Sequence, residues 1–250
     1  MERIIVTGGA GFIGTHLVKK LRIKYKVYVI DPKSTEPEER VDNIDTVFDL
    51  AALPLPMSLV EPYKLVNELY QIGLILCKAA RHKLFKTLIH VSSSEVLNIT
   101  TPYAAAKDAQ DKLITSYKIA FGIDAHIVMP FNTYGPGQVW DAIIPFTIKR
   151  ILKGERPIIN GTGEHSRDLV YVDDTVKGII DRKPIITTGE CYSVNEIVER
   201  ISKLMNYKGK PIHKEDRKGD TPNIHHERTL DKYVSLEEGL KRTIEWWKKQ

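Results

Sequence analysis

Short apolar runs alternate with amphipathic stretches along the first half of the chain. The runs predict buried strands at residues 4–6, 26–31, 46–50, 86–94 and 125–131. Between them, apolar residues recur at the spacing of one helix face and predict helices at residues 12–21, 65–76 and 103–121. Because strands that alternate with helices in this way form parallel sheets, we expect an α/β fold, a doubly wound parallel sheet with helices on both faces.

The second half of the chain has a mixed pattern. Residues 143–152 predict a helix, and residues 167–172 predict a short strand. Ser193 begins a capping-box sequence, which predicts the start of a helix that continues through Met205. A similar sequence at residues 235–238 precedes the last apolar helix face. These elements predict a smaller, mixed part after the parallel sheet.

A Thr-Gly-Gly-Ala-Gly-Phe-Ile-Gly segment joins the first strand to the first helix. Gly8 permits a tight turn, Gly11 lets the backbone approach a pyrophosphate, and Gly14 lets the helix pack close to the strand. The helix then begins with Phe12 and Ile13, and its free N–H groups and positive dipole end face the phosphates. This order of strand, glycine turn and helix is typical of a Rossmann dinucleotide-binding domain. A turn used only for packing is the alternative.

An acidic residue ends the second predicted strand, about 20 positions after the glycines, as dinucleotide binding requires. Asp31 would accept hydrogen bonds from the adenosine ribose and repel a 2′-phosphate, which favours NAD over NADP, although Lys33 could pair with a phosphate. The third strand is followed by Leu50, Ala51 and Ala52, and the small side chains here let the backbone pass close to the cofactor.

Composition narrows the function classes. The chain has 250 residues, 42% of them hydrophobic and 28% charged, as in a soluble globular protein. The net charge of +5 is spread out without a basic stripe, so we expect no nucleic-acid partner. Two distant cysteines, Cys77 and Cys191, predict neither a disulfide framework nor a metal site. Without a signal-peptide pattern or a membrane-spanning run, we expect a cytoplasmic protein and no membrane partner.

A candidate proton-transfer site follows the fourth strand. Tyr103 and Lys107 lie one helical turn apart, and a lysine ammonium near a tyrosine hydroxyl favours the phenolate, a general base. The alanines between them would keep this face clear for a ligand. Ser93, at the strand tip, could hydrogen-bond the substrate oxygen, and Glu95 is either a second acid or base or a surface carboxylate. Without the dinucleotide fingerprint, an ordinary exposed helix face would be the default interpretation.

These motifs together resemble the extended short-chain dehydrogenases/reductases, specifically the NAD-dependent epimerase/dehydratase family that acts on nucleotide sugars, such as UDP-glucose 4-epimerases. The resemblance covers the glycine segment, residues 48–52, residues 130–136 and residues 161–174. A histidine is usual in the family where Asp49 stands. The resemblance identifies Ser93 with the catalytic Ser/Thr, and Tyr103 and Lys107 with the family's Tyr-x-x-x-Lys pair.

The resemblance also implies substrate contacts. Asn132 would contact the nucleotide-sugar phosphates, Arg167 the nucleotide and Arg217 the diphosphate. Dehydratases usually have Asp where Ser94 stands, which favours an epimerase. The implied reaction begins when Tyr103 removes a proton from the sugar C4 hydroxyl and hydride passes to NAD, which gives a transient 4-keto sugar. Lys107 would lower the pKa of Tyr103 and hold the nicotinamide ribose.

The chain is shorter than most members of this family. Between Asp31 and the next strand there is little room for the usual third strand, which normally helps to hold adenine. We expect residues 1–135 to form most of the NAD-binding Rossmann domain, and residues 136–250 a smaller substrate-binding part with segments that return to it. The resemblance implies a homodimer. The alternatives are a nucleotide-sugar dehydratase or decarboxylase, a catalytically silent NAD-binding sensor or scaffold, and a reductase that uses free NADPH.

Overall fold

A computed structural model of the chain describes residues 1–34, 42–52, 59–138, 142–215 and 223–250. The described chain forms two compact units. The first unit is residues 1–130 with residues 176–185, and the second is residues 131–175 with residues 186–250. The assignment of an NAD-binding domain to residues 1–135 and a substrate-binding part to residues 136–250 stays a prediction.

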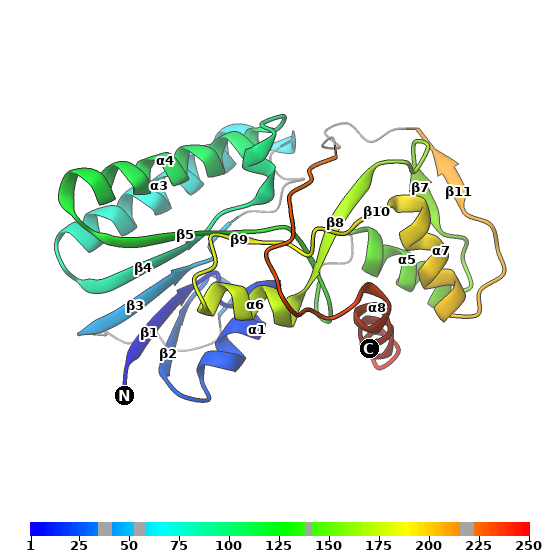
Figure 1. The fold of residues 1–250 in the computed structure, drawn as a ribbon, viewed down its shortest axis with the longest axis horizontal. Coiled ribbons are helices and arrows are strands. Elements are labelled where there is room, and N and C mark those ends of the chain that lie inside the picture. The colour runs from blue at the N-terminus through cyan, green and yellow to red at the C-terminus, as the bar shows by residue number, and fades with distance from the viewer. Residues whose placement is uncertain (35–41, 53–58, 139–141, 216–222) are drawn as a thin grey trace. The chain divides into compact units, whose positions relative to one another are not determined.

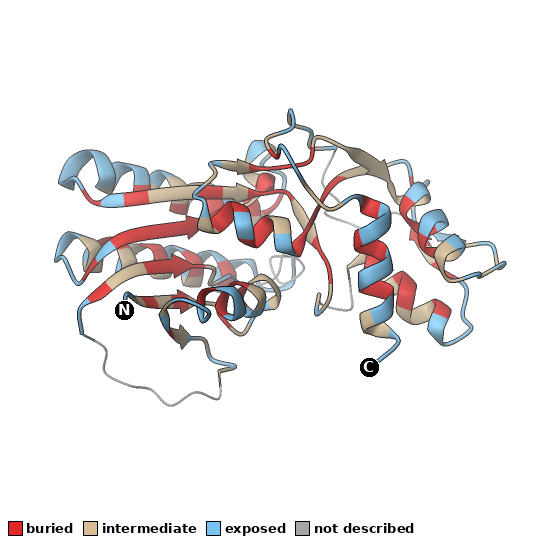
Figure 2. Ribbon diagram, turned by 60° about the horizontal axis from the view of Figure 1, so that its bottom comes forward, coloured by how far each residue is buried: buried red, intermediate tan, exposed pale blue. Residues whose placement is uncertain are grey.

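The first unit is built on the expected parallel sheet, in which the two central strands β3 and β4 are mostly buried (Figures 1 and 2). Its strand order is β2-β1-β3-β4-β5-β9, and neighbours from β2 through β5 are parallel. The strands are β1 (Arg3–Thr7), β2 (Lys26–Ile30), β3 (Ile44–Asp49), β4 (Phe85–Val91), β5 (Asp124–Pro130) and β9 (Ile185–Ile186). The α/β fold predicted from the apolar runs is therefore confirmed.

The segment after β2 is short, and the edge of the sheet reflects this. Strand β2 is the edge strand of the sheet, and the described residues between β2 and β3 form no further strand. Because β1 pairs with β2 on one side and with β3 on the other, the glycine turn after β1 still lies between two strand ends.

Helices α3 (Pro62–Arg81) and α4 (Pro102–Phe121) lie side by side on one face of the sheet, and α1 (Phe12–Leu21) lies on the other (Figure 1). Both long helices have proline in the first turn, where a missing N–H costs nothing. Helix α4 is capped by Thr101, whose hydroxyl accepts a hydrogen bond from Ala104 N at 3.2 Å, and it ends at Gly122 in the left-handed region. The predicted helices are confirmed.

The fourth strand ends earlier than predicted. Strand β4 ends at Val91, and Ser94–Leu97 form a 3₁₀ helix (η1). Ser93 ends the extended backbone because its hydroxyl accepts a hydrogen bond from Glu95 N at 3.3 Å and caps this turn. The apolar run alone does not reveal such a local cap.

The described residues of the second unit form two small sheets and three helices that lie wholly within it. Its strands are β6 (Asn132–Tyr134), β8 (Ser166–Tyr171) and β10 (Cys191–Ser193) in one sheet and β7 (Ile158–Asn160) and β11 (Ile212–Lys214) in the other. Its helices are α5 (Ile143–Leu152), α7 (Val194–Leu204) and α8 (Leu236–Trp247), while α6 (Val172–Ile180) begins in this unit and ends in the first. The capping box predicted at Ser193 is present, because its hydroxyl accepts from Glu196 N at 3.1 Å.

A buried carboxylate stabilises the second unit. Asp168 is fully buried and accepts hydrogen bonds from the Thr187 hydroxyl, from the Thr188 hydroxyl at 3.0 Å and from Gly189 N at 3.1 Å. In Asp168→Asn, an NH₂ group would face these donors, so we expect the free energy of unfolding to fall by about 2 kcal/mol. Urea unfolding measures this loss. The exposed Asp181→Asn is the control and should change stability by less than about 0.5 kcal/mol, and equal effects would contradict the argument.

Candidate active site

The glycine turn between β1 and α1 is too tight for side chains. Gly8 has a φ of +66°, and a Cβ there would lie 2.6 Å from the Leu50 carbonyl oxygen. A Cβ on Gly14 would lie 2.2 Å from the Gly8 carbonyl oxygen, which itself accepts a hydrogen bond from Gly11 N at 3.0 Å. The turn therefore lets α1 approach the tip of β1 closely, as the glycine spacing predicts.

The start of α1 is suited to an anion. Helix α1 begins after Gly11, and the residues that the structure describes place no capping side chain and no acidic residue in its first turn. Phe12 and Ile13 are the first residues of this turn, so their N–H groups lack a partner within the helix. Such a terminus provides N–H donors and a positive dipole end to phosphate oxygens. The residues present thus fit the pyrophosphate of a dinucleotide.

Asp31 lies where the ribose contact is expected, directly after β2. Its carboxylate accepts hydrogen bonds from Ala10 N in the glycine turn, at 3.2 Å, and from Lys33 N, at 2.8 Å. Two backbone donors hold this carboxylate beside the turn, where it can also accept hydrogen bonds from ribose hydroxyls. Leu50 and Ala51 line the turn as well, since a Cβ on Gly8 would meet the backbone of both.

Ser93, Glu95 and Tyr103 come together after β4. Tyr103 is half-buried, packs against Leu65 and Leu69 of α3, and is hydrogen-bonded to Ser93. Glu95 is buried in η1, so the interpretation of this residue as a surface carboxylate is wrong. Ser94 is also buried in η1.

Lys107 is expected to lower the pKa of Tyr103, but it is not among the groups that shift this pKa. Burial raises the pKa of Tyr103 to about 12, the carboxylates of Glu95 and Asp111 act in the same direction, and hydrogen bonding with Ser93 opposes them. Lys107 is fully buried, and its Nζ instead donates to Val91 O at 2.8 Å and contacts His90 Nε2 at 3.2 Å. These groups of the chain therefore leave Tyr103 protonated at neutral pH.

Two of the three alanines between Tyr103 and Lys107 have a different role from the one expected, while Ala105 is exposed. Ala104 and Ala106 are buried, and Ala106 packs with Leu65 and Leu69 in the interface between α4 and α3. They hold the helix close to its neighbour instead of keeping a surface clear for a ligand.

The partners of Lys107 are not apparent from the sequence pattern. Asp49 Oδ2 lies 2.7 Å from His90 Nδ1, and the two residues are paired across strands β3 and β4. Both are buried, and His90 Nε2 also lies 3.3 Å from Asp111 Oδ1. The family usually has a histidine where Asp49 stands, and this difference is the signal in the sequence that could have pointed to an unusual partner. It does not identify that partner, because His90 is 41 residues away in the chain.

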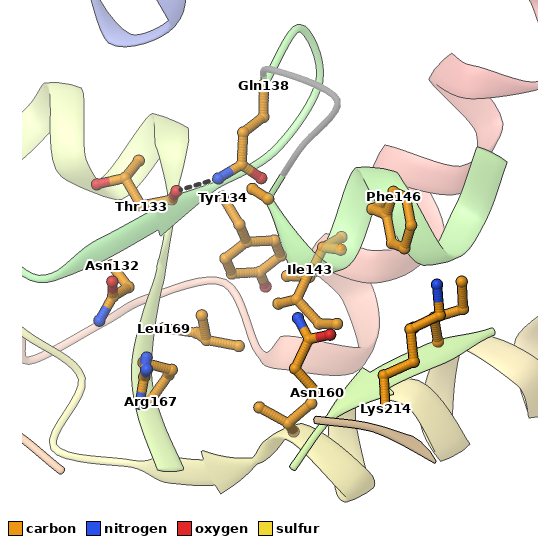
Figure 3. A pocket seen from close by; sticks show the side chains of 14 residues that line it. Asn132, Thr133, Tyr134, Gln138, Ile143, Phe146, Asn160, Arg167, Leu169 and Lys214 are labelled. Atoms are coloured by element: carbon orange, nitrogen blue, oxygen red, sulfur yellow. Dashed lines mark hydrogen bonds between the residues drawn. The ribbon is translucent and has the colours of Figure 1, made fainter. Parts of the chain in front are cut away.

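The second unit has a pocket of about 560 Å³ (Figure 3). Asn132 pairs with Leu169 across β6 and β8, which places Arg167, two residues along β8, on the same face. Both predicted residues, Asn132 and Arg167, line this pocket. The lining also includes polar and apolar side chains that the sequence pattern did not identify, namely Gln138, Ile143, Phe146, Asn160, Val194 and Lys214. Arg217 lies outside the described residues.

Comparisons with known proteins identify the family of the chain. Residues 4–181 match the model of the NAD dependent epimerase/dehydratase family. A UDP-glucose 4-epimerase of Thermotoga maritima, solved with UDP-glucose, is 28% identical, with a TM-score of 0.90 over 99% of both chains. A UDP-glucuronate 4-epimerase of Thermodesulfobacterium geofontis is 37% identical over 59% of this chain and 50% of its own length.

A third similar protein is MoeE5, solved in complex with UDP-glucose and NAD. It is 27% identical, with a TM-score of 0.87 over 99% of both chains. In the part of the chain that the structure describes, no helix is both long and apolar enough to cross a membrane. The family match spans most of the first unit, from β1 to the end of α6. The chain therefore belongs to the NAD-dependent epimerase/dehydratase family.

Proposed function

We propose that the chain is an NAD-dependent UDP-sugar 4-epimerase that works through a transient 4-keto sugar. The observation that carries this proposal is the hydroxyl pair of Ser93 and Tyr103, placed after β4 in the same sheet whose β1 leads into the glycine turn. In a parallel sheet these strand ends lie at one edge, where ligands bind. The proposal assigns proton transfer to Tyr103.

The residues that would hold NAD are those of the glycine turn, Asp31 and Lys107. The pyrophosphate fits the uncapped start of α1, and Asp31 favours the unphosphorylated ribose of NAD over NADP. NAD would supply hydride transfer from the sugar C4 and back to the opposite face of the 4-keto sugar, and its positive ring would favour the Tyr103 phenolate. Leu50, Ala51 and Ala52 complete the proposed cofactor contacts.

The chain's own residues would handle the proton. Tyr103 takes the proton of the C4 hydroxyl and gives it back when the alcohol re-forms, so that no proton is lost overall. Ser93 hydrogen-bonds the same oxygen and steadies it in both states. Because the pKa of Tyr103 is about 12 without cofactor, the tyrosine becomes an effective base only when opposing positive charge arrives.

Epimerisation is favoured over other reactions of the family. Two of the similar proteins described above are named 4-epimerases. Ser94 stands where dehydratases usually have Asp, which weighs in the same direction. Dehydration or decarboxylation would need a second acid or base, and Glu95, whose charge acts on Tyr103, is the residue we would assign to that role. A silent NAD-binding sensor would not need Ser93, Tyr103 and Lys107 together.

The pocket of the second unit would bind the uridine diphosphate. Arg167 and Lys214 offer positive charge to the phosphates, and Asn132 and Asn160 offer amide hydrogen bonds. Apolar lining residues such as Phe146 suit the faces of a nucleobase (Figure 3). We assign Arg217, whose place in the structure is not described, to the same diphosphate on the family motif alone.

Arg167→Ala should weaken substrate binding. A guanidinium pairs with phosphate oxygens in a fixed fork, so we expect KM for UDP-glucose to rise by about 10- to 100-fold with a smaller change in kcat. Initial rates at saturating NAD measure this. Lys177→Ala removes an exposed charge outside the pocket and should leave KM unchanged. An unchanged KM in Arg167→Ala would exclude this residue from substrate binding.

A product assay tests the proposed function directly. Purified protein is incubated with NAD and UDP-glucose, then with UDP-glucuronate and UDP-N-acetylglucosamine, and the products are separated by anion exchange and identified by NMR. The C4 epimer is the expected product. A 4-keto-6-deoxy sugar would indicate a dehydratase, and a pentose would indicate a decarboxylase. NAD binding by calorimetry without any turnover would favour the sensor.

A homodimer and a cytoplasmic location complete the proposal. Helix α3 leaves Tyr63, Val66 and Tyr70 exposed at positions i, i+3 and i+7, and Tyr63 is 86% exposed. An apolar stripe of this kind suits a second copy of the chain.

The proposed cytoplasmic location follows from the proposed substrates, because NAD and nucleotide sugars are both available in the cytoplasm.

A further inference from the structure

A buried series of polar side chains in the first unit ends at Lys107. We propose that His90 is a positioning residue, which holds the Lys107 ammonium in place for catalysis, and that Asp49 sets the tautomer of His90. This inference rests on the proposed function for its catalytic consequence only. The arrangement of Asp49, His90 and Lys107 is testable by itself.

The geometry forms a continuous sequence of short contacts. The Thr7 hydroxyl donates to Asp49 Oδ1 at 2.6 Å, and Asp49 Oδ2 lies 2.7 Å from His90 Nδ1. His90 Nε2 lies 3.2 Å from Lys107 Nζ, which also donates to Val91 O at 2.8 Å. Asp49, His90 and Lys107 are each at most 1% exposed. The contacts among Asp49, His90 and Lys107 are therefore shielded from water.

The tautomer follows from the charge of Asp49. Burial raises the pKa of Asp49, but its hydrogen bond with His90, the charge of Lys107 and the hydrogen bond from Thr7 lower it, and the pKa lies below its usual value. An ionised carboxylate only accepts hydrogen bonds, so His90 Nδ1 carries the proton and donates. In the neutral ring, Nε2 is then an acceptor for the Lys107 ammonium.

Two further groups face this series, and neither changes the assignment. Asp111 Oδ1 lies 3.3 Å from His90 Nε2, which is longer than the 2.7 Å contact with Asp49, and the Ser92 hydroxyl donates to Asp111 Oδ2 at 2.5 Å. Cys77 on α3 is buried, and burial raises the pKa of its thiol to about 11, so it stays neutral. Asp49 therefore dominates the choice of tautomer.

The consequence concerns the orientation of Lys107. Two hydrogens of the ammonium are directed to Val91 O and His90 Nε2, so rotation about its last bond is restricted and the third hydrogen has one direction. Without these two acceptors, the ammonium group at the end of the flexible lysine side chain would rotate and lose this orientation. Burial also lowers the pKa of Lys107, and the charges of Asp49 and Asp111 oppose this effect. The two carboxylates thus help to keep the amine charged.

NMR of the imidazole nitrogens tests the tautomer without any reference to activity. In ¹⁵N-labelled full-length protein with NAD added, His90, assigned by its loss in His90→Gln, should be the Nδ1-protonated tautomer at pH 8. In Asp49→Asn, that signature should be lost. An Nε2-protonated His90 in the wild type, or an unchanged tautomer in Asp49→Asn, would overturn the inference.

Kinetics tests the positioning role. His90→Phe keeps a ring of similar size without the two nitrogens, and we expect kcat to fall about 10- to 100-fold while KM for UDP-glucose stays within about threefold. His90→Gln keeps an acceptor for Lys107 and should recover part of the loss. The control is Thr87→Val, which removes a hydrogen bond to Asp124 from the same strand and should keep the wild-type kcat.

The possible failures are distinguishable. If no nucleotide sugar is turned over, the proposed function fails, but the NMR result still decides the arrangement of Asp49 and His90. If the enzyme is active and His90→Phe retains the wild-type kcat, only the positioning role falls. Should His90→Phe fail to fold, as thermal unfolding would show, His90→Gln and Asp49→Asn supply the kinetic test. A wild-type kcat in both would equally overturn the inference.

Discussion

Tyr103→Phe is expected to lower kcat by about 10²- to 10⁴-fold, the range that a positioned general base contributes. The substitution removes a single oxygen from a half-buried ring that packs against Leu65 and Leu69, so the packing of α4 on α3 remains. NAD affinity and the thermal unfolding midpoint should therefore stay close to those of the wild type. Stopped-time product assays and calorimetric titration with NAD measure the two expectations separately.

Tyr117→Phe is the matched control for this prediction. Tyr117 lies on the same helix, packs against the core and makes a ring contact with Phe121, so the same atom is removed from the same element. Its kcat should equal that of the wild type. Turnover by Tyr103→Phe at the wild-type rate would remove Tyr103 from the mechanism, whatever the family resemblance implies.

The features that the sequence predicts well are local ones. The glycine turn and Asp31 are recognisable because strand, turn, helix and second strand follow one another within the first 31 residues, and their spacing alone fixes the geometry. The spacing of Tyr103 and Lys107 within one helix is predicted for the same reason. Such features depend on few residues outside the segment itself.

The features that sequence pattern missed depend on sheet register. His90 faces Asp49 only because β4 pairs with β3 in one register, and no pattern within either strand encodes that pairing. The pKa of Tyr103 likewise depends on burial and on the charge of Asp111, which lies about two turns further along α4. Local spacing predicts that Lys107 lies near Tyr103, but it does not predict to which acceptors the Lys107 ammonium donates hydrogen bonds.

The pocket of the second unit is a comparable case. Asn160 ends β7 and Lys214 ends β11, and the pairing of these two strands brings together residues 54 positions apart in the chain. Each strand has three residues, which is too short for an alternating pattern to be recognised. The family motif identified Asn132 and Arg167 because a motif specifies particular residue types and does not require that a strand or helix be recognised.

Gly14→Ala is expected to reduce NAD affinity by about 10- to 100-fold, since overpacking of this kind costs about 1–3 kcal/mol. The added Cβ would lie 2.2 Å from the Gly8 carbonyl oxygen and 2.8 Å from the Gly9 Cα, both of which are backbone atoms. The Gly8 oxygen also accepts the hydrogen bond from Gly11 N that closes the turn. Relief of the clash must therefore move the backbone proposed to contact the pyrophosphate.

Gly73→Ala separates this effect from a general intolerance of alanine. Gly73 lies within α3, is buried, and a Cβ there would meet its nearest atom, Gln110 Cγ, at 3.4 Å, an ordinary contact. Alanine should favour the helix by about 0.5–1 kcal/mol and leave NAD binding unchanged. Calorimetric titration of both variants with NAD gives the comparison. Equal affinities in Gly14→Ala and Gly73→Ala would mean that the glycine turn packs the helix without binding a dinucleotide, because only the first substitution displaces the turn.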